Sequence, residues 1–271
     1  MKLRRILPVV LLLAVFLLWQ NFSIQTPRTT VSLPQLPAAF SGLRVVELAD
    51  LHGRSFGRDN RRLLKALRRL QPDIICIDGD FFDEKTDLSM VAPLAAQLCA
   101  IAPTFYVTGN HEWRVGTLSQ VLAAMREQGV TVLRNDYRLL RRSGERIVIA
   151  GVDDPNGPAD QKTPEQLVEQ IRREQGQDVF ILMLAHRNDT MSLWSSLGVQ
   201  LVLTGHCHGG VIRLPLLGGV FGAGETFFPD YDAGLYREGD TALYVSRGLG
   251  YSRCRFRLFN RPELSLLVLQ N

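Results

Sequence analysis

The sequence lacks the paired cysteines that disulfide-stapled domains and zinc ribbons require. It has 4 cysteines in 271 residues, widely spaced, with no Cys-x-x-Cys pair. A chain of this length can bury a full core without disulfides, and it suits one large domain or two small ones. Three of the cysteines lie in apolar-rich segments, where we interpret them as small hydrophobic residues.

Proline is not enriched, and outside the N-terminus the basic and acidic residues are equal in number. Only 13 prolines and a charged fraction of 21% argue against long disordered regions. The net charge of +4 originates in residues 1–28, which hold Lys2, Arg4, Arg5 and Arg28 and no acid. Removing these four leaves 27 of the 31 basic residues, and they balance the 27 acidic ones. The body is therefore neutral, and we expect no nucleic-acid partner.

One long apolar run stands at the N-terminus. Residues 6–19 are fourteen uncharged and strongly apolar residues, and the uncharged stretch continues to Pro27, which gives 22 residues. Such a stretch can cross a bilayer if its polar end sits in the interface. Residues 20–25 offer no small-residue cleavage site of the kind that a removed signal peptide needs. Basic residues flank only the front, so the positive-inside rule places the N-terminus in the cytoplasm.

We therefore predict an uncleaved signal-anchor transmembrane segment over residues 1–25. Residues 26–42, rich in Pro, Thr and Ser, are predicted to be a spacer, and residues 43–271 the domain. The protein would be a single-pass protein of the cell membrane with its domain on the extracytoplasmic side. The alternative for the apolar run is a buried core helix, and its isolated position at the N-terminus argues against this.

The middle of the chain repeats one pattern. A short apolar run rich in β-branched residues is followed at once by small, polar or ionisable residues, which is typical of a buried strand that ends in a functional turn. The six instances are 43–50, 74–80, 104–111, 147–154, 179–186 and 199–206.

Helical patterns lie between these runs. Residues 60–71 carry leucines on one face, residues 117–128 end before a glycine, Thr163 begins a capping box with Gln166, and residues 189–197 again stop at a glycine. This alternation of strand and helix predicts an α/β fold. The C-terminal segments 241–246, 254–259 and 263–269 are strand-like with no helix between them, which favours antiparallel pairing.

Two groups of basic residues leave two interpretations open. The first group has helical spacing and comprises Arg58, Arg61, Arg62, Lys65, Arg68 and Arg69; the second alternates along a predicted strand and comprises Arg253, Arg255 and Arg257. Both groups are interpreted either as solvated faces or as surfaces that rest against anionic lipid headgroups near the anchor.

All five histidines fall at the ends of predicted strands, and acidic or amide residues stand beside them. In open α/β sheets, ligands bind beyond the carboxyl ends of the strands. The side chains placed there are Asp50, His52, Asp80, Asn110, His111, His186, His206 and His208. Imidazole and oxygen donors without a suitably placed thiolate pair suit Mn²⁺, Fe or Zn²⁺ in mixed coordination.

These residues form motifs that resemble the calcineurin-like metallophosphoesterases in order and approximate spacing. The motifs are Asp50-x-His52, Gly79-Asp80-x-x-Asp83, Gly109-Asn110-His111-Glu112, Ala185-His186 and Gly205-His206-x-His208. The likeness runs from about Leu43 to the C-terminus. The segments 246–250 and 260–263 look similar to the end of the bacterial branch of YkuE- and YaeI-like phosphodiesterases.

The resemblance implies a four-layer αββα sandwich that holds two divalent metal ions. One metal would take Asp50, His52, Asp80 and His208; the other would take Asp80, Asn110, His186 and His206. Asp80 would bridge the two ions. A metal-bridging hydroxide would attack phosphorus in line, and His111 would act as the general acid on the leaving oxygen.

Other residues next to these motifs are not assigned to metal binding or catalysis. We interpret Asp78 as structural, Cys207 as a spacer between ligands, and Asp153-Asp154 as a polar turn with Asx hydrogen bonds.

The sequence thus predicts a membrane-anchored, metal-dependent phosphohydrolase, and a phosphodiesterase in particular, with a phosphoester substrate that could be lipid-linked. One alternative is pyrophosphate cleavage in a nucleotide-linked lipid such as UDP-diacylglucosamine. Another is a non-catalytic scaffold braced by metal; the complete ligand set argues against it. The natural substrate, the metal and the oligomeric state are open at this point.

Overall fold

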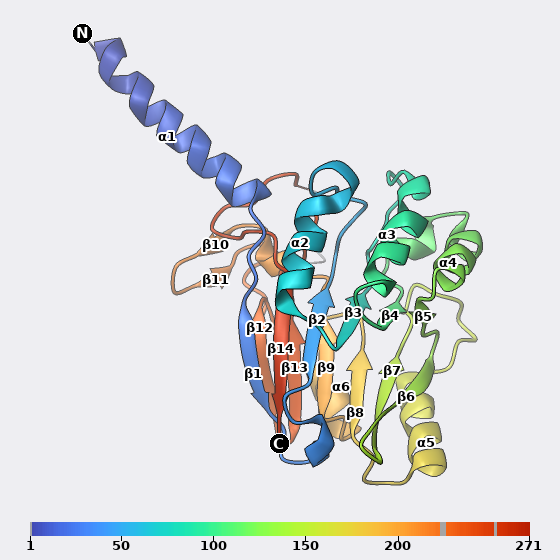
Figure 1. The fold of residues 1–271 in the computed structure, drawn as a ribbon. Helices are drawn as coiled ribbons and strands as arrows, with labels where there is room; N and C mark the ends of the chain where they lie inside the picture. The colour runs from blue at the N-terminus through green and yellow to red at the C-terminus, as the bar shows by residue number, and fades with distance from the viewer. Residues whose placement is uncertain (1, 223–225, 252–253) are drawn as a thin grey trace.

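The described residues of the computed structural model, 2–222, 226–251 and 254–271, form two six-stranded sheets (Figure 1). The first sheet has the order β1 (Arg28–Ser32), β14 (Ser265–Gln270), β2 (Arg44–Leu48), β3 (Ile74–Asp78), β4 (Thr104–Val107) and β5 (Thr131–Val132). The second has the order β12 (Gly234–Glu238), β13 (Thr241–Val245), β9 (Leu201–Thr204), β8 (Ile181–Leu184), β7 (Glu145–Gly151) and β6 (Asp136–Arg142). The central strands β2, β3 and β4 of the first sheet are parallel, as are β7, β8, β9 and β13 of the second.

Helices cover the outer face of each sheet. The first sheet packs against α2 (Arg61–Leu70), α3 (Val91–Cys99) and α4 (Leu118–Glu127), and the second against α5 (Pro164–Gln175) and α6 (Met191–Ser196). A third apolar cluster lies between the sheets. The layers are therefore helix, sheet, sheet and helix, which confirms the predicted αββα sandwich.

The two faces of one strand show why the apolar runs do not alternate with polar residues. Along β2, Val45 packs into the cluster between the sheets, whereas Val46 and Leu48 pack toward the helices. Neighbouring side chains of a strand point to opposite faces, so a strand buried on both sides is apolar on both faces. The exception in β2 is Glu47, which is fully buried.

The helices predicted over residues 60–71, 117–128 and 189–197 are α2, α4 and α6, and each begins and ends within two residues of the predicted position; α3 was not predicted. At α5, the Thr163 hydroxyl accepts the Gln166 N–H at 3.3 Å, and the Gln166 side-chain oxygen accepts the Thr163 N–H at 2.9 Å. This reciprocal pair is the predicted capping box, and Pro164 occupies the first helical position.

The predicted spacer contains a strand of the first sheet. Residues 28–32 form β1, which pairs in parallel with β14, and Val31, Leu36 and Phe40 are buried. The spacer prediction was therefore wrong for this part of residues 26–42. Threonine and valine favour strands, and this preference outweighed the proline-rich composition on which the prediction rested.

The predicted strand over residues 254–259 was also wrong. Arg257 is only 2% exposed, and its guanidinium donates to the backbone oxygens of Gly250 and Arg247 at 2.6–2.9 Å. Arg255 is exposed, and Arg253 lies outside the described residues. Arg257 is therefore a buried residue that stabilises the loop around Arg247 and Gly250, and it does not belong to a basic surface. The six basic residues at helical spacing around α2 are exposed.

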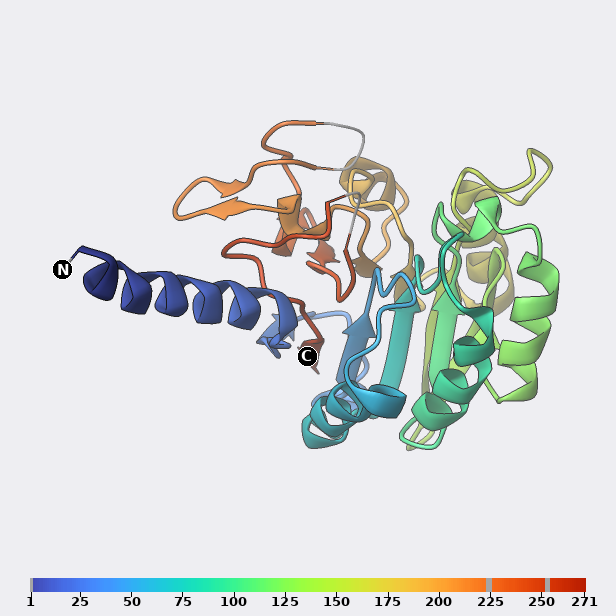
Figure 2. The ribbon, with the colours of Figure 1, turned by 90° about the horizontal axis from the view of Figure 1, so that it is seen from above.

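The first helix, α1 (Lys2–Phe22), projects from the sandwich (Figures 1 and 2). Its last turn is attached to the domain: the Asn21 side chain accepts the Arg257 N–H at 2.8 Å and donates to the Arg257 oxygen at 3.1 Å. The uncharged stretch continues past the helix into the domain, where Gln25 pairs with Glu263. Within the described residues, we find no helix whose length and apolar character suffice to cross a membrane.

Candidate metal centre

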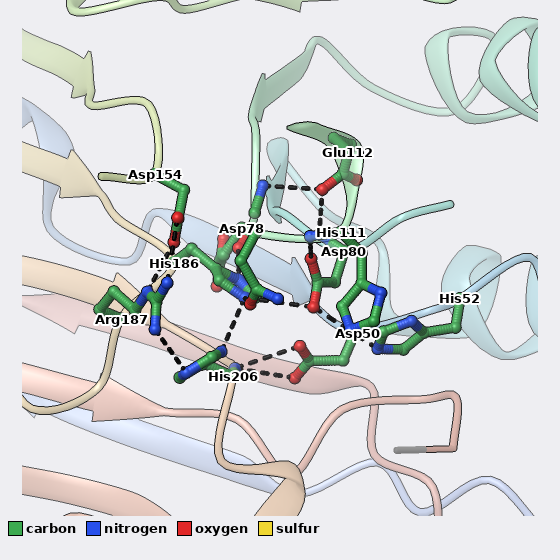
Figure 3. A network of polar contacts seen from close by, with 12 residues as sticks. Asp50, His52, Asp78, Asp80, His111, Glu112, Asp154, His186, Arg187 and His206 are labelled. Atoms are coloured by element: carbon green, nitrogen blue, oxygen red, sulfur yellow. Dashed lines mark hydrogen bonds and ion pairs between the residues drawn. The ribbon is translucent and has the colours of Figure 1, made fainter. Parts of the chain in front are cut away.

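Loops at the carboxyl ends of both sheets meet at one site (Figure 3). The first sheet contributes Asp50 and His52 after β2, Asp80 after β3, and Asn110 and His111 after β4. The second sheet contributes His186 after β8, and His206 and His208 after β9. The structure therefore brings together all eight side chains that the sequence placed at strand ends.

Several residues of this site have a strained, left-handed backbone. Five of the site residues have left-handed backbone: φ is 49° at Asp50, 47° at His52, 47° at Asp80, 67° at His206 and 50° at His208. A positive φ is uncommon outside glycine and costs about 1–2 kcal/mol per residue. Strain repeated at neighbouring polar residues is typical of a functional site.

One group of donor atoms gathers around Asp50, His52 and His208, all within 4.8 Å of one another. The Nε2 atoms of His52 and His208 are 3.1 Å apart. The Asp50 carboxylate lies 3.8 Å from His208 Nε2, and the Asp80 carboxylate lies 3.6 Å from His52 Nε2. The two imidazoles and two carboxylates thus face one small volume.

A second group gathers around Asp80, His186 and His206. His186 Nε2 lies 3.3 Å from the Asp80 carboxylate, 3.1 Å from the Asn110 oxygen and 3.0 Å from His206 Nδ1. The same oxygen of Asp80, Oδ2, faces His52 in the first group and His186 in the second. Asp80 is therefore shared by both groups.

Surrounding contacts orient these imidazoles. His186 Nδ1 lies 2.8 Å from the Asp78 backbone oxygen and donates to it, which turns Nε2 toward the site. Burial and the charges of His186 and Arg187 lower the pKa of His206 to about 2. Burial, followed by the charge of His52, holds the pKa of His208 well below its usual value. Both are neutral imidazoles, as metal ligation requires.

The carboxylates give the centre a strong preference for positive charge. Burial lowers the pKa of His186, but the charge and hydrogen bond of Asp80 outweigh it and raise that pKa to about 10. Once the imidazoles are neutral, imidazole nitrogens, an amide oxygen and carboxylate oxygens that face each other are the donor set that divalent cations take in mixed N/O sites. The residues present therefore fit metal binding.

Glu112 fixes the two loops that carry Asp80 and Asn110. This side chain is fully buried, and its carboxyl oxygens accept N–H bonds from Asp80 at 2.9 Å, Phe81 at 2.7 Å and Gly109 at 2.8 Å. Burial and the charge of Asp80 raise the pKa of Glu112 to about 8. One side chain thus ties the loop after β3 to the loop after β4.

His111 stands at the edge of the site. Its N–H donates to Asp80 Oδ1 at 2.8 Å, and its ring packs edge-on to that of His52 with centroids 4.8 Å apart. Its Nδ1 lies 3.0 Å from the Glu84 carboxylate. No role for Glu84 was predicted from the sequence, although Glu84 directly follows the Gly79-Asp80-x-x-Asp83 motif.

Asp83 and Asp154 support the site from outside. Asp83 lies 3.4 Å from His52 Nδ1. Partial burial raises the pKa of Asp83, but hydrogen bonds from His52 and Thr86 outweigh it and lower that pKa to about 2. Asp154 makes the expected Asx bond to the Asn156 N–H at 2.9 Å and also pairs with Arg187 at 2.6 Å. Arg187 in turn lies 3.0 Å from His206 Nε2, a contact that the sequence did not indicate.

Asp78 lies beneath the site, as its structural interpretation requires. It is fully buried, and burial raises the pKa of its carboxyl to about 7. Its role at the site is through its backbone oxygen, which orients His186.

Two groups of imidazoles that share a carboxylate, at the edge of an αββα sandwich, define the protein as a metal-dependent hydrolase. Residues 43–210 match the calcineurin-like phosphoesterase family, and the chain belongs to this family. It is a metal-dependent phosphoester hydrolase.

Curated relatives agree with this assignment. The chain is 28% identical over 256 residues to the metallophosphoesterase YkuE of Bacillus subtilis, covering 92% of this chain and 86% of that protein. It is 32% identical over 203 residues to the phosphodiesterase YaeI of Escherichia coli, covering 73% and 71%. The expected bacterial branch is thus confirmed.

Among solved structures, the fold is similar to that of TT1561 from Thermus thermophilus, with a TM-score of 0.52, 13% identity and coverage of 77% of this chain and 90% of that one. It is also similar to the NAD nucleotidase of Haemophilus influenzae, with a TM-score of 0.53, 15% identity and coverage of 76% and 45%. At these identities, the likeness shows the fold alone.

We predict that Glu112→Gln destabilises the site. Either orientation of the amide places its NH₂ group against backbone N–H donors, so a buried pair of donors loses its acceptor. The free energy of unfolding should fall by about 2–3 kcal/mol, and Mn²⁺ affinity should fall with it. Chemical denaturation and calorimetric Mn²⁺ titration measure both quantities. The matched control is Glu127→Gln at the exposed end of α4; equal values for the two variants would contradict the role of Glu112.

Proposed function

We propose that the protein is a phosphodiesterase that works with two divalent cations. The observation that carries this proposal is the position of Asp80, whose Oδ2 faces His52 at 3.6 Å and His186 at 3.3 Å. Asp50, His52, Asp80 and His208 would hold one cation. Asp80, Asn110, His186 and His206 would hold the other. Mn²⁺, Fe and Zn²⁺ suit this donor set.

Cations bound here would supply a water nucleophile of lowered pKa and offset the negative charge of the phosphoryl oxygens. The protein residues position the reaction and move its proton. His111 lies beside the Asp80 loop with a partly exposed ring, and Glu84 contacts its Nδ1, so Nε2 is available to a substrate. His111 donates a proton to the leaving oxygen as its bond to phosphorus breaks.

The preference for a diester is supported by the name of one relative, the phosphodiesterase YaeI, at 32% identity. Bis(p-nitrophenyl) phosphate and p-nitrophenyl phosphate distinguish diester from monoester hydrolysis in the purified protein. Faster turnover of the monoester would contradict the diester preference.

We expect Asp80→Asn to abolish hydrolysis, because it removes the one charge that both cation positions share. The rate on bis(p-nitrophenyl) phosphate should fall at least about 1,000-fold, and the Mn²⁺ content should fall below two ions per chain. Steady-state kinetics and elemental analysis check this. Asp160→Asn, at an exposed carboxyl away from the site, serves as the control. A fully active Asp80→Asn protein with two bound ions would refute the shared-ligand assignment.

His111→Ala should keep metal and lose rate, more severely for leaving groups of high pKa, where protonation matters most. A loss of about 100-fold or more is expected for an alkyl leaving group and a smaller one for p-nitrophenol. A plot of rate against leaving-group pKa should therefore steepen. Glu84→Gln should show the same trend more weakly, since it only positions His111. A uniform loss across leaving groups would exclude His111 as the acid.

We further propose that the uncharged stretch of residues 6–27, which runs past the end of α1, attaches the domain to the cell membrane, with the N-terminus in the cytoplasm and the catalytic domain on the extracytoplasmic side. The proposal is supported by the fourteen apolar residues 6–19, by the basic residues that precede them, and by the exposure of large apolar side chains such as Leu7, Leu12 and Leu18 on a projecting helix.

Cell fractionation tests this attachment. The protein should be released from membranes only by detergent, and protease added to spheroplasts should digest its body. Arginine at Leu11 and Leu12 should shift it to the soluble fraction, because each costs about 2.5–3.5 kcal/mol within a bilayer. Alanine at the same positions is the matched control. A protease-resistant body in spheroplasts would reverse the orientation, and recovery of the unaltered chain in the soluble fraction would refute attachment.

A further inference from the structure

The hairpin formed by β10 (Arg213–Leu214) and β11 (Gly218–Gly219) carries apolar side chains that the domain does not cover. At its tip Leu216 is fully exposed and Leu217 is 66% exposed. Downstream of the hairpin, Phe227 and Phe228 are exposed as well. Single exposed apolar residues are ordinary, but exposed leucines and phenylalanines in a hairpin and in the segment that follows it mark a surface that contacts a partner.

The hairpin projects on the same side of the molecule as α1 (Figure 2). Its base pairs with the C-terminal loop, where Ile212 bridges Leu258 and the Arg213 N–H donates to the Leu258 oxygen at 3.0 Å. The next residue, Phe259, is half-exposed, and its ring lies 5.8 Å from that of Phe16 on α1. Phe259 therefore joins the apolar surface of α1 to that of the hairpin.

Aromatic and cationic side chains border this surface where α1 meets the domain. The guanidinium of Arg261 lies 4.4 Å from the Trp19 ring, and that of Arg54 lies 4.0 Å from the Tyr251 ring. Arg62 donates to the Phe22 oxygen at 3.2 Å. Tryptophan, tyrosine and arginine at the edge of an apolar surface match the headgroup level of a bilayer, where rings and guanidinium groups meet phosphate and water.

We propose that the β10–β11 hairpin is a second membrane-contact element, whose tip inserts into the outer lipid layer beside α1. This inference rests on the proposed attachment of α1. A phospholipid bilayer is the occupant that fits best, because the exposed leucines at the hairpin tip suit acyl chains, and the rings and guanidinium groups at the root of α1 suit the headgroup phosphates.

The hairpin also connects this surface to the metal centre. The loop that carries His208 leads directly into the hairpin, and Asn260 holds both ends of that connection by donating to the oxygens of His208 at 2.8 Å and Val211 at 3.1 Å. Insertion of the hairpin into lipid therefore sets the distance between the metal centre and the membrane surface. Phosphoesters of lipid headgroups are the substrate class that such an arrangement presents to the site.

Tryptophan quenching by brominated lipids tests the insertion in the full chain. Leu216→Trp protein is reconstituted in vesicles of phosphatidylcholine and phosphatidylglycerol, with or without bromine on the acyl chains. The fluorescence added by Trp at position 216 should be quenched roughly twofold or more, as expected for a side chain 5–10 Å inside the interface. Leu217→Trp provides a second position. Arg142→Trp, at the exposed end of β6, is the matched control and should show no added quenching.

The outcomes separate the two proposals. If the native fluorescence, which includes Trp19, is not quenched, the attachment of α1 fails. If native fluorescence is quenched but neither hairpin tryptophan exceeds the Arg142→Trp control, only the hairpin inference is overturned. If the emission from position 216 instead shifts with protein concentration and ignores bromine, the hairpin contacts a second copy of the chain, which also overturns the inference.

Discussion

The fold at the metal centre depends on a single electrostatic constraint, which is the concentration of acceptor groups around Asp80. Two carboxylates and the lone pairs of several imidazoles lie within 3–4 Å of each other in a buried volume. Such groups repel one another unless positive charge lies among them. The surrounding structure is built to hold them in this arrangement: left-handed backbone at Asp80, the backbone N–H bonds to Glu112, and glycine at positions 79 and 109. A Cβ on Gly79 would collide with Gly109, and a Cβ on Gly109 would collide with the Asp80 carboxylate.

The meeting of these side chains could be predicted from the sequence because the ends of parallel strands lie at one edge of a sheet. Asp50 and His186 directly follow an apolar run, and Asp80 comes just after one, so their meeting required only the sandwich topology. The contacts of Glu84 and Arg187 could not be predicted in this way. Both depend on how a loop folds back, and neither residue differs in type from an ordinary surface residue.

Arg257 is a second residue whose environment could not be predicted from the sequence pattern. An arginine every second residue is the usual sign of a solvated strand face, yet this one is buried among backbone oxygens. Burial, followed by the charge of Arg54, lowers its pKa to about 9, and it remains a cation at neutral pH. Chain carbonyls that no strand or helix uses need a donor, and a guanidinium can satisfy several at once. Composition alone does not reveal which loop will leave such carbonyls unpaired.

The junction between α1 and the domain has a consequence for how this protein can be divided. Asn21 bonds to the backbone of Arg257, and the guanidinium of Arg257 lies 3.4 Å from His208 Nδ1. The helix root and a metal-centre loop therefore share one arginine. A protease cut after Phe22 would leave the Asn21–Arg257 hydrogen bonds in place as long as the helix fragment stayed bound to the domain. A gene that starts after Phe22 would instead produce a domain in which Arg257 lacks the contact with Asn21. A domain released by proteolysis and a domain expressed without residues 1–22 therefore differ in the contacts of Arg257. An insertion or a fusion at this junction alters the contacts of an arginine that itself lies against His208.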